Sequence, residues 1–246
     1  MDIDSILFRS SAVGNLMGKQ GIGLTGEKLL IETYIEHKYG RSKDIVSKYL
    51  DKGTQCEQQG IDLLNKISGE NYVKNEIRIA NEYITGECDI NADEIIDIKS
   101  SWDIYTHFAA KRGLNSIYEW QLRCYMELYK KEHAKLVYTL TNASEIQVLT
   151  TLEKEAYKHP LGTPEWKEIE IVKNMVYDQE GFDKYKMFRQ WQGDDETSDG
   201  LLRTFIHIPE EDRIFSYDFT HDKAKIQSLY ERIILGRDFL KQQFNG

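Results

Sequence analysis

The chain has 246 residues, of which 40% are hydrophobic and 11% aromatic, and its formal net charge is −9. This length allows one large domain with a sizeable core, and the composition excludes an intrinsically disordered chain. The acidic total argues against broad non-specific nucleic-acid binding, but it is compatible with a local basic cleft or a metal-bridged phosphate site.

Other features of the sequence indicate a protein of the cytoplasm. No apolar run approaches the roughly 18 residues that span a bilayer, and the first ten residues carry acids where a signal peptide carries bases. The three cysteines, Cys56, Cys88 and Cys124, are odd in number and widely spaced. We therefore expect neither a disulfide framework nor an iron–sulfur cluster.

The first third of the chain predicts helices, because apolar residues recur at helical spacing and two of the segments end at a glycine. These helices are predicted over 5–17, 27–40 and 53–69. The period then changes to two, which predicts strands within 71–90 and over 93–100, joined by a turn at 91–93.

The second half returns to helices and adds further strands. Helices are predicted over about 103–111 and 116–132, a strong strand over 134–142, a closing strand over 201–209 and an amphipathic helix over 222–244. This order predicts an α/β or α+β protein with a central mixed sheet flanked by helices.

The segment between the strand predicted over 134–142 and the strand predicted over 201–209 is more acidic than the rest of the chain. Residues 145–200 contain thirteen acidic and seven basic residues, which is two thirds of the excess negative charge of the chain. Residues 144–192 predict helices, and 193–200 predict a turn-rich loop. We expect one domain over 1–246, with 144–200 as a mainly helical acidic insertion or cap.

The predicted strand over 93–100 contains charged residues that its apolar character does not explain. Successive side chains of a strand point to opposite faces, so Ile96 and Ile98 share one face while Asp97 and Lys99 share the other. Asp89 lies just upstream, and two converging carboxylates make a hard-oxygen site suited to Mg²⁺ or Mn²⁺. An acid–lysine pair on an exposed strand face is the alternative.

Two neighbouring helices carry polar residues that this site could use. Glu57 is placed on or beside the apolar face of its helix, where an acid is unexpected, although a surface glutamate is the alternative. Gln121 and Tyr125 are four residues apart and share a helix face, so they could hold a catalytic residue or a phosphate. Polarity at the edge of the core explains this pair equally well.

Taken in order, these residues resemble a known family. Glu57, then Gly86-Glu87-Cys88-Asp89, Asp97-Ile98-Lys99, and Gln121 with Tyr125 resemble the motifs of the PD-(D/E)XK nuclease superfamily. The similar branch contains the lambda-type phage exonucleases and the nuclease domains of bacterial recombination helicases. The resemblance covers about residues 1–140 and weakly the C-terminal helix, and it implies a restriction-endonuclease-like core.

The resemblance implies a role for each of these residues. Asp89 and Asp97 would be the principal metal ligands, assisted by the Ile98 carbonyl group, and Glu57 would contact the metal directly or through water. Lys99 would position or activate the attacking water. Gln121 would orient the lysine or the water, and Tyr125 would support the helix or approach the DNA backbone.

The N-terminal segment resembles the opening motif of the lambda-type branch, in which arginine and serine residues meet the DNA 5′ phosphate. Arg9 with Ser10 or Ser11 are the matching residues. A guanidinium group and hydroxyl groups near a helix start suit a terminal phosphate. The alternative is that one of the serines only caps a helix.

From the resemblance we expect a Mg²⁺-dependent DNA exonuclease, with Mn²⁺ able to substitute, that acts 5′→3′ on linear duplex ends in phage-type recombination. It also implies a homo-oligomeric ring (a trimer), a single-strand annealing protein as partner, and a bacterial host cell. The alternatives are a structure-specific or restriction-like endonuclease on the same fold and a DNA-binding or assembly protein that does not cleave.

Overall fold

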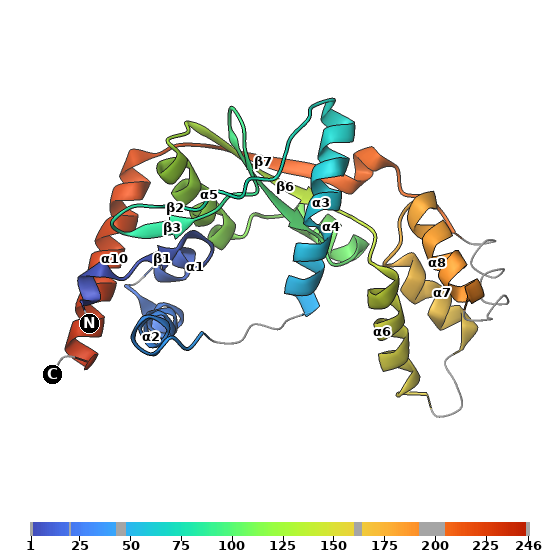
Figure 1. Ribbon diagram of the computed structural model, residues 1–246, viewed down its shortest axis with the longest axis horizontal. Coiled ribbons are helices and arrows are strands. Elements are labelled where there is room, and N and C mark those ends of the chain that lie inside the picture. Colours follow the sequence, from blue (N-terminus) through green and yellow to red (C-terminus); the bar gives the residue numbers. More distant parts are fainter. Residues whose placement is uncertain (1, 20, 43–47, 160–163, 192–204, 245–246) are drawn as a thin grey trace.

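The computed structural model of the protein describes residues 2–19, 21–42, 48–159, 164–191 and 205–244 (Figure 1). This part of the chain contains two small sheets with helices around them. The predicted class, a mixed α/β protein with a central mixed sheet, is therefore confirmed. The described residues contain no helix that is long and apolar enough to cross a membrane.

The central sheet has four strands in the order β4-β5-β6-β7. They are β4 (Ile90–Asn91), β5 (Ile95–Ser100), β6 (His133–Thr139) and β7 (Ile214–Thr220). β5 is parallel to β6, and the outer pairs are antiparallel. The strands predicted over 93–100 and 134–142 are confirmed, and β5 is an inner strand, as its isoleucine-rich sequence indicates.

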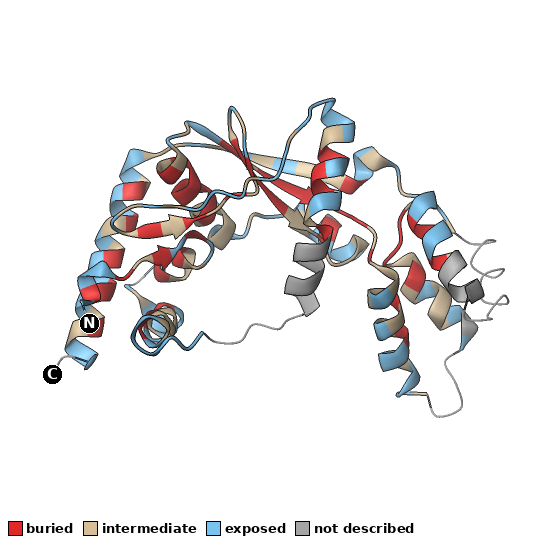
Figure 2. Ribbon diagram, in the orientation of Figure 1, coloured by how far each residue is buried: buried red, intermediate tan, exposed pale blue. Residues whose placement is uncertain are grey.

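A helix covers each face of this sheet. They are α3 (Lys48–Ser68) and α5 (Ser116–Tyr129). Ile96 and Ile98 pack with Ile61 of α3, whereas Ile95 packs with Leu122 of α5. Figure 2 shows buried residues on the inner strands and on the sides of these helices that face them. The two faces of β5 therefore meet different helices.

The second sheet lies near the N-terminus and has the order β1-β3-β2. Its strands are β1 (Phe8–Arg9), β2 (Ile79–Ala80) and β3 (Ile84–Gly86). The helices α2 (Gly23–Tyr39) and α10 (Lys223–Phe244) contribute Leu30 and Leu229 to the hydrophobic cluster beside this sheet. The helices predicted over 27–40 and 222–244 are confirmed, and Gly40 ends α2 at a φ of 60°.

The helix predicted over 5–17 is wrong in part. The segment is divided into a 3₁₀ turn (Ile3–Ser5), β1, the one-turn helix α1 (Ser10–Val13) and a second 3₁₀ turn (Gly14–Leu16). Phe8 pairs with Ile84 of β3, and its N–H group donates to the Tyr83 carbonyl oxygen at 3.0 Å. Pairing with a distant strand therefore overrides the local helical pattern.

The strand predicted within 71–90 is also shorter than expected. Residues 71–78 have no regular structure, and only β2, β3 and β4 form within the segment. The Asn75 side chain donates to the carbonyl oxygens of Ile77 and Cys88, and the Asn75 N–H group donates to the Asp89 carbonyl oxygen. These bonds replace the ladder partners of a continuous strand.

Two helices connect β5 to β6. They are α4 (Ile104–Ala110) and α5. Asp103 caps the start of α4 by accepting from the Thr106 N–H group, and Asn115 caps α5 by accepting from the Ile117 N–H group. The helices predicted over 103–111 and 116–132 are confirmed. α5 ends three residues early, at Tyr129, and the next residue, Lys130, has a positive φ of 56°.

Three helices form a unit at one end of the molecule (Figure 1). They are α6 (Glu145–Ala156), α7 (Glu165–Lys173) and α8 (Gln179–Trp191). Val148, Val172 and Phe182 belong to a hydrophobic cluster that these helices share. The helices predicted within 144–192 are confirmed for the described residues of this segment, and the description of 144–200 as an insertion or cap on one domain stays a prediction.

The closing strand is not where it was expected. Residues 205–209 have no regular structure, and the remaining part of the predicted strand over 201–209, like the loop at 193–200, lies outside the described residues. The edge strand is instead β7, preceded by a 3₁₀ turn (Glu210–Arg213). Phe215, Tyr217 and Phe219 alternate with polar residues there, which is the pattern of a half-buried strand.

Candidate active site

Asp97 and Lys99 lie side by side on the face of β5 that meets α5. Asp97 is buried, with 1% of the residue exposed, and Lys99 Nζ lies 2.6 Å from Asp97 Oδ2. Apart from this ammonium group, Asp97 Oδ2 has no hydrogen-bond partner among the described residues. The predicted pairing of these two residues on one strand face is therefore present, and the pair is largely covered.

Asp89 reaches the same site from the segment between β3 and β4. Its Oδ2 accepts a hydrogen bond of 2.6 Å from the Ile98 N–H group. Because β4 folds back on β5, this contact places the Asp89 carboxylate directly beside Asp97 and Lys99. Burial and, next, the negative charge of Asp97 raise the pKa of Asp89 to about 8.

Lys99 partly compensates the charge of the two carboxylates. Burial disfavours its ammonium form, but the charges of Asp97 and Asp89 outweigh burial and raise the pKa of Lys99. The ammonium group also lies 5.1 Å from the centre of the Tyr118 ring, on α5. Lys99 is thus a fixed cation whose direction is set by Asp97 and an aromatic ring.

Gln121 and Tyr125 form the next layer, and both are buried on α5. Gln121 Nε2 donates to Asp97 Oδ1 at 3.1 Å and to the Tyr125 hydroxyl oxygen at 2.9 Å. Gln121 therefore contacts the aspartate, whereas the resemblance assigned it to the lysine or the water. Tyr125 supports Gln121 from within the core, and burial followed by the charge of Asp97 raises its pKa.

Gly86 allows the elements of the site to approach one another. A Cβ atom at this position would lie 2.4 Å from Ser10 Oγ and 2.7 Å from Tyr125 Cε1. Any side chain at position 86 would push β3 away from α1 and α5. Asp89, which lies only three positions further along the chain, would be displaced with it. The glycine of the Gly86–Asp89 motif is thus explained by close packing.

The N-terminal residues are placed in different environments. Ser10 is 1% exposed, and its hydroxyl group donates to the Thr85 carbonyl oxygen at 3.0 Å. Ser11 is exposed, and the half-exposed Arg9 side chain pairs with Glu36 of α2. Of the three residues, Arg9 and Ser11 are accessible to a ligand, while Ser10 joins α1 to β3.

Glu57 lies at the edge of the site, on α3. Its carboxylate raises the pKa of Asp89, although less than Asp97 does, so the two are close enough to interact. Glu57 Oε1 lies 3.0 Å from Lys74 Nζ. No group of three or more acidic, histidine or cysteine side chains among the described residues converges closely enough to hold a metal ion. Glu57 would have to leave Lys74 to bind one.

The donors that do converge fit a hard divalent cation. Asp89 and Asp97 repel each other, Asp97 Oδ2 has only Lys99 as a partner, and carboxylate oxygens are the ligands that Mg²⁺ and Mn²⁺ prefer. A cation between the two aspartates would relieve this repulsion. Asp89, Asp97 and the Ile98 carbonyl group are the residues that would hold it.

Sequence reasoning did not find Lys74 or Tyr118. Tyr118 precedes Gln121 by three residues and Tyr125 by seven, which is the spacing of one helix face, so helical periodicity could have found it. Lys74 belongs to an irregular segment without a pattern. Its contact with Glu57 depends on the tertiary fold alone.

Comparison with solved structures shows that this fold is shared by known proteins. A phage-related exonuclease from Haemophilus somnus 129PT has a TM-score of 0.69 and 21% identity, over 98% of this chain and 96% of that chain. The alkaline exonuclease LHK-Exo from Laribacter hongkongensis, alone or in complex with dAMP, has a TM-score of 0.59 and 12% identity, over 98% of this chain and 94% of that chain.

The similarity in fold extends further along the chain than the motif resemblance. The motif resemblance covered about residues 1–140 and, weakly, the C-terminal helix, whereas the structural similarity spans 98% of the chain. No protein-family model matches the sequence, and no curated protein matches it.

Proposed function

We propose that the chain is a Mg²⁺-dependent deoxyribonuclease that removes nucleotides from duplex DNA ends, in the 5′→3′ direction, during phage-type recombination. The observation that carries the proposal is the cluster of Asp89, Asp97, Lys99 and Gln121 on a fold shared with two proteins described as exonucleases. Mn²⁺ would substitute for Mg²⁺, because both take carboxylate oxygens.

The chain's own residues would each perform one task. A bound divalent cation would polarise the scissile phosphate and lower the pKa of a water molecule. Lys99, held by Asp97 and Tyr118, would direct its ammonium group at the attacking water or at the negative charge that develops on the phosphate. Gln121 would fix the rotamer of Asp97 through its 3.1 Å hydrogen bond.

Glu57 and the N-terminal residues would complete substrate binding. Glu57 would join the cation directly or through water, after Lys74 is released from it. Arg9 and Ser11 would bind the 5′ phosphate, because both are accessible and a guanidinium group pairs well with phosphate. Arg9 would exchange Glu36 for the phosphate, while Ser10 and Tyr125 would support the site from the core.

The resemblance supports further proposals about the setting. It favours a ring-shaped homotrimer around DNA, a single-strand annealing protein as partner, and the cytoplasm of a bacterial host as the compartment. These three proposals depend on the resemblance, because the structure contains one chain.

Digestion of an end-labelled linear duplex with Mg²⁺ or with EDTA tests the activity. We expect Mg²⁺-dependent release of mononucleotides by the parent and none by Asp97→Asn. Asp93→Asn is the matched control, since Asp93 is an exposed aspartate in the turn between β4 and β5. Equal digestion by parent and Asp97→Asn would refute the assignment.

Two further substrates separate the alternatives. Covalently closed circular DNA should remain intact, whereas an endonuclease on the same fold would cut it. Duplexes with a 5′ phosphate, a 5′ hydroxyl group or one blocked end report polarity, and we expect Arg9→Ala to abolish the preference for the 5′ phosphate. Binding of DNA without any hydrolysis would instead indicate a non-cleaving protein.

A further inference from the structure

Lys74 is a second lysine beside the candidate active site, and the proposed reaction leaves its charge unused. Its Nζ atom lies 3.0 Å from Glu57 Oε1, and 41% of its side chain is exposed. The hydrogen bond to Glu57 raises the pKa of Lys74 against the effect of burial, and the charge of Asp89 raises it further. The ammonium group therefore lies near both acids, at a position that solvent and a ligand can reach.

The segment that carries Lys74 has no regular structure, but the next residue, Asn75, fixes it in place. The Asn75 N–H group donates to the Asp89 carbonyl oxygen at 2.7 Å. The Asn75 side-chain amide donates to the Cys88 carbonyl oxygen at 3.0 Å and to the Tyr129 hydroxyl oxygen at 3.1 Å. Because these bonds reach the backbone of Asp89 itself, the fold sets the position of Lys74 relative to this aspartate.

The charges of the site indicate when Lys74 would leave Glu57. Three carboxylates and two ammonium groups lie together, and they belong to Glu57, Asp89, Asp97, Lys74 and Lys99. When all are ionised, one negative charge is uncompensated. One divalent cation would turn this into one excess positive charge, which a phosphodiester group neutralises. A cation that takes Glu57 as a ligand also removes the partner of Lys74, so this lysine becomes available to the phosphate.

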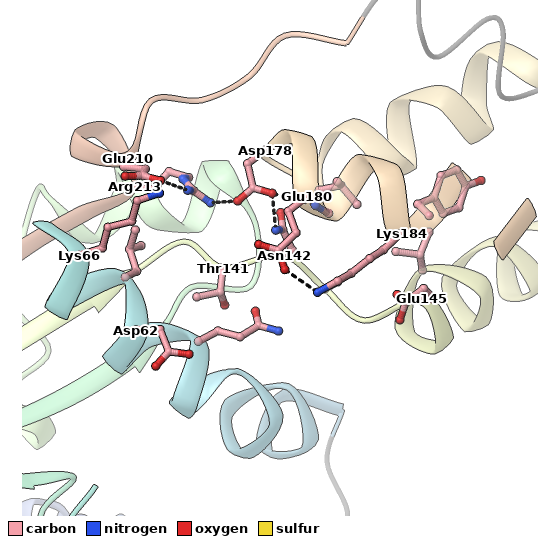
Figure 3. Close-up of a pocket in the computed structure, with 17 residues that line it drawn as sticks. Asp62, Lys66, Thr141, Asn142, Glu145, Asp178, Glu180, Lys184, Glu210 and Arg213 are labelled. Carbon is pink, nitrogen blue, oxygen red and sulfur yellow. Dashed lines mark hydrogen bonds and ion pairs between the residues drawn. The ribbon is translucent and has the colours of Figure 1, made fainter. Parts of the chain in front are cut away.

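Other ion pairs of the protein have no such connection to the candidate active site. A polar pocket between α3 and the helices α6 and α8 contains the pairs of Arg213 with Asp178 and of Lys184 with Glu180 (Figure 3). None of the residues assigned to the candidate active site lines this pocket. Lys184 is therefore a matched control for Lys74, because it is an ion-paired lysine away from the proposed cation and phosphate.

We propose that Lys74 exchanges Glu57 for the DNA phosphate at the cleavage site when a divalent cation binds. This proposal rests on the proposed function, because it requires a cation at Asp89 and Asp97 and DNA as the ligand. Without the cation, Lys74 stays on Glu57 and competes with the cation for this carboxylate. After the exchange, its ammonium group donates a charge-assisted hydrogen bond to a phosphate oxygen.

Calorimetric titration of the metal-free protein with Mn²⁺, without DNA, tests the competition for Glu57. Lys74→Met keeps an unbranched side chain of similar length but removes the charge. This variant should bind Mn²⁺ roughly three- to tenfold more tightly than the parent, because no ammonium group has to leave Glu57. Lys184→Met should bind Mn²⁺ as the parent does. Equal or weaker Mn²⁺ binding by Lys74→Met would overturn the proposal.

Binding of a fluorescently labelled DNA duplex, at equal ionic strength in Ca²⁺ or in EDTA, tests the exchange. Ca²⁺ takes oxygen ligands, as Mg²⁺ does. Lys74→Met should weaken DNA binding roughly tenfold in Ca²⁺ but less than twofold in EDTA, whereas Lys74→Arg should retain most of the affinity in Ca²⁺. A lysine that only adds positive charge to the surface would weaken binding equally under both conditions, and that result would overturn the proposal.

These titrations separate the role of Lys74 from the proposed function. If the parent binds neither Mn²⁺ nor DNA, the proposed function and the role of Lys74 both fail. If the parent binds both and Lys74→Met behaves like the parent and Lys184→Met in either titration, only the role of Lys74 fails.

Discussion

Two clusters of polar residues in this molecule shift the pKa of an aspartate in opposite directions. At the joint between the sheet and the helical unit, Asp178 accepts from Asn142, the Gly181 N–H group and Arg213, each at 2.7–2.8 Å. Burial disfavours the charge of Asp178, but these donors outweigh it and lower its pKa. At the candidate active site, Asp97 of β5 and Asp89 have Lys99 and, farther away, Lys74 as nearby cations among the described residues, and the pKa of Asp89 rises to about 8.

From this difference we infer that the Asp178 cluster stabilises the fold, and that the Asp97 cluster is the one that would bind the proposed cation. A carboxylate with all its hydrogen bonds made contributes to stability when it is charged. Two carboxylates that repel each other, one buried and one half-buried, lower stability unless a cation joins them. Substitutions in the two clusters should therefore have opposite effects on stability and activity.

The largest effect should be the loss of activity when Lys99 is removed. Lys99→Ala should reduce DNA hydrolysis at least roughly a thousandfold, because no other described lysine contacts Asp97 and the developing charge on the phosphate loses its cation. Initial rates on an end-labelled duplex, at saturating Mg²⁺, measure this. Arg213→Ala provides the contrast, and its activity per folded molecule should stay within about threefold of the parent.

The second-largest effect should be the loss of stability when the Asp178 cluster loses Arg213. Arg213 is 4% exposed, and Arg213→Ala would leave Asp178 without its cation, at a cost of about 3 kcal/mol in the free energy of unfolding. Urea denaturation of the parent and the variant checks this value. A loss below about 0.5 kcal/mol would mean that the joint does not depend on this ion pair.

Asp89→Asn should raise the free energy of unfolding, whereas Arg213→Ala lowers it. The folded-state pKa of Asp89, about 8, lies above its ordinary value, so the folded protein retains a proton that the unfolded chain loses as the pH rises from about 4. The free energy of unfolding of the metal-free parent should therefore fall between about pH 4 and pH 8. Asn keeps an acceptor for the Ile98 N–H group, so we expect the variant to be about 2–4 kcal/mol more stable above pH 8 and inactive.

Denaturation in EDTA at about pH 5 and pH 9 tests this pH dependence. The stability difference between Asp89→Asn and the parent should be small at the lower pH and large at the higher pH. A difference that does not change with pH would show that burial and Asp97 do not disfavour the charge of Asp89.

The smallest effect should be that of Tyr125→Phe. The change removes one acceptor of Gln121 Nε2 but leaves its bond to Asp97, so stability should fall by about 1 kcal/mol and the rate by no more than about fivefold. Gln121→Ala should cost more, roughly tenfold to a hundredfold in rate, since Asp97 Oδ1 then loses its donor. Equal losses in the two variants would mean that Gln121 does not act through Asp97.

Much of the candidate active site was predictable from sequence, because several of its residues lie close together in the sequence. Strand alternation placed Asp97 with Lys99, and helical spacing placed Gln121 with Tyr125. The predicted turn between two strands brought Asp89 towards Asp97, but the hydrogen bond from the Ile98 N–H group to Asp89 was not predicted.

What could not be predicted depends on long-range pairing. Phe8 joins a strand 76 positions along the chain, at Ile84, against its local helical pattern. The Asp178 cluster joins three segments that lie 35 or more positions apart, so no window of sequence contains it. The edge strand β7 is a different case. Its aromatic residues alternate with polar ones within 214–220, so strand periodicity predicts it, and the prediction of a strand over 201–209 was wrong.

Calorimetric titration of the metal-free protein with Mn²⁺ tests the central claim most directly. We expect one or two ions to bind at Asp89 and Asp97, with release of about one proton near pH 7 and almost none at about pH 9, because Asp89 must lose its proton before it can bind a cation. Proton release is obtained from the dependence of the binding heat on the buffer. Absence of Mn²⁺ binding, or unchanged binding by Asp97→Asn, would contradict the assignment of this cluster as a metal-dependent active site.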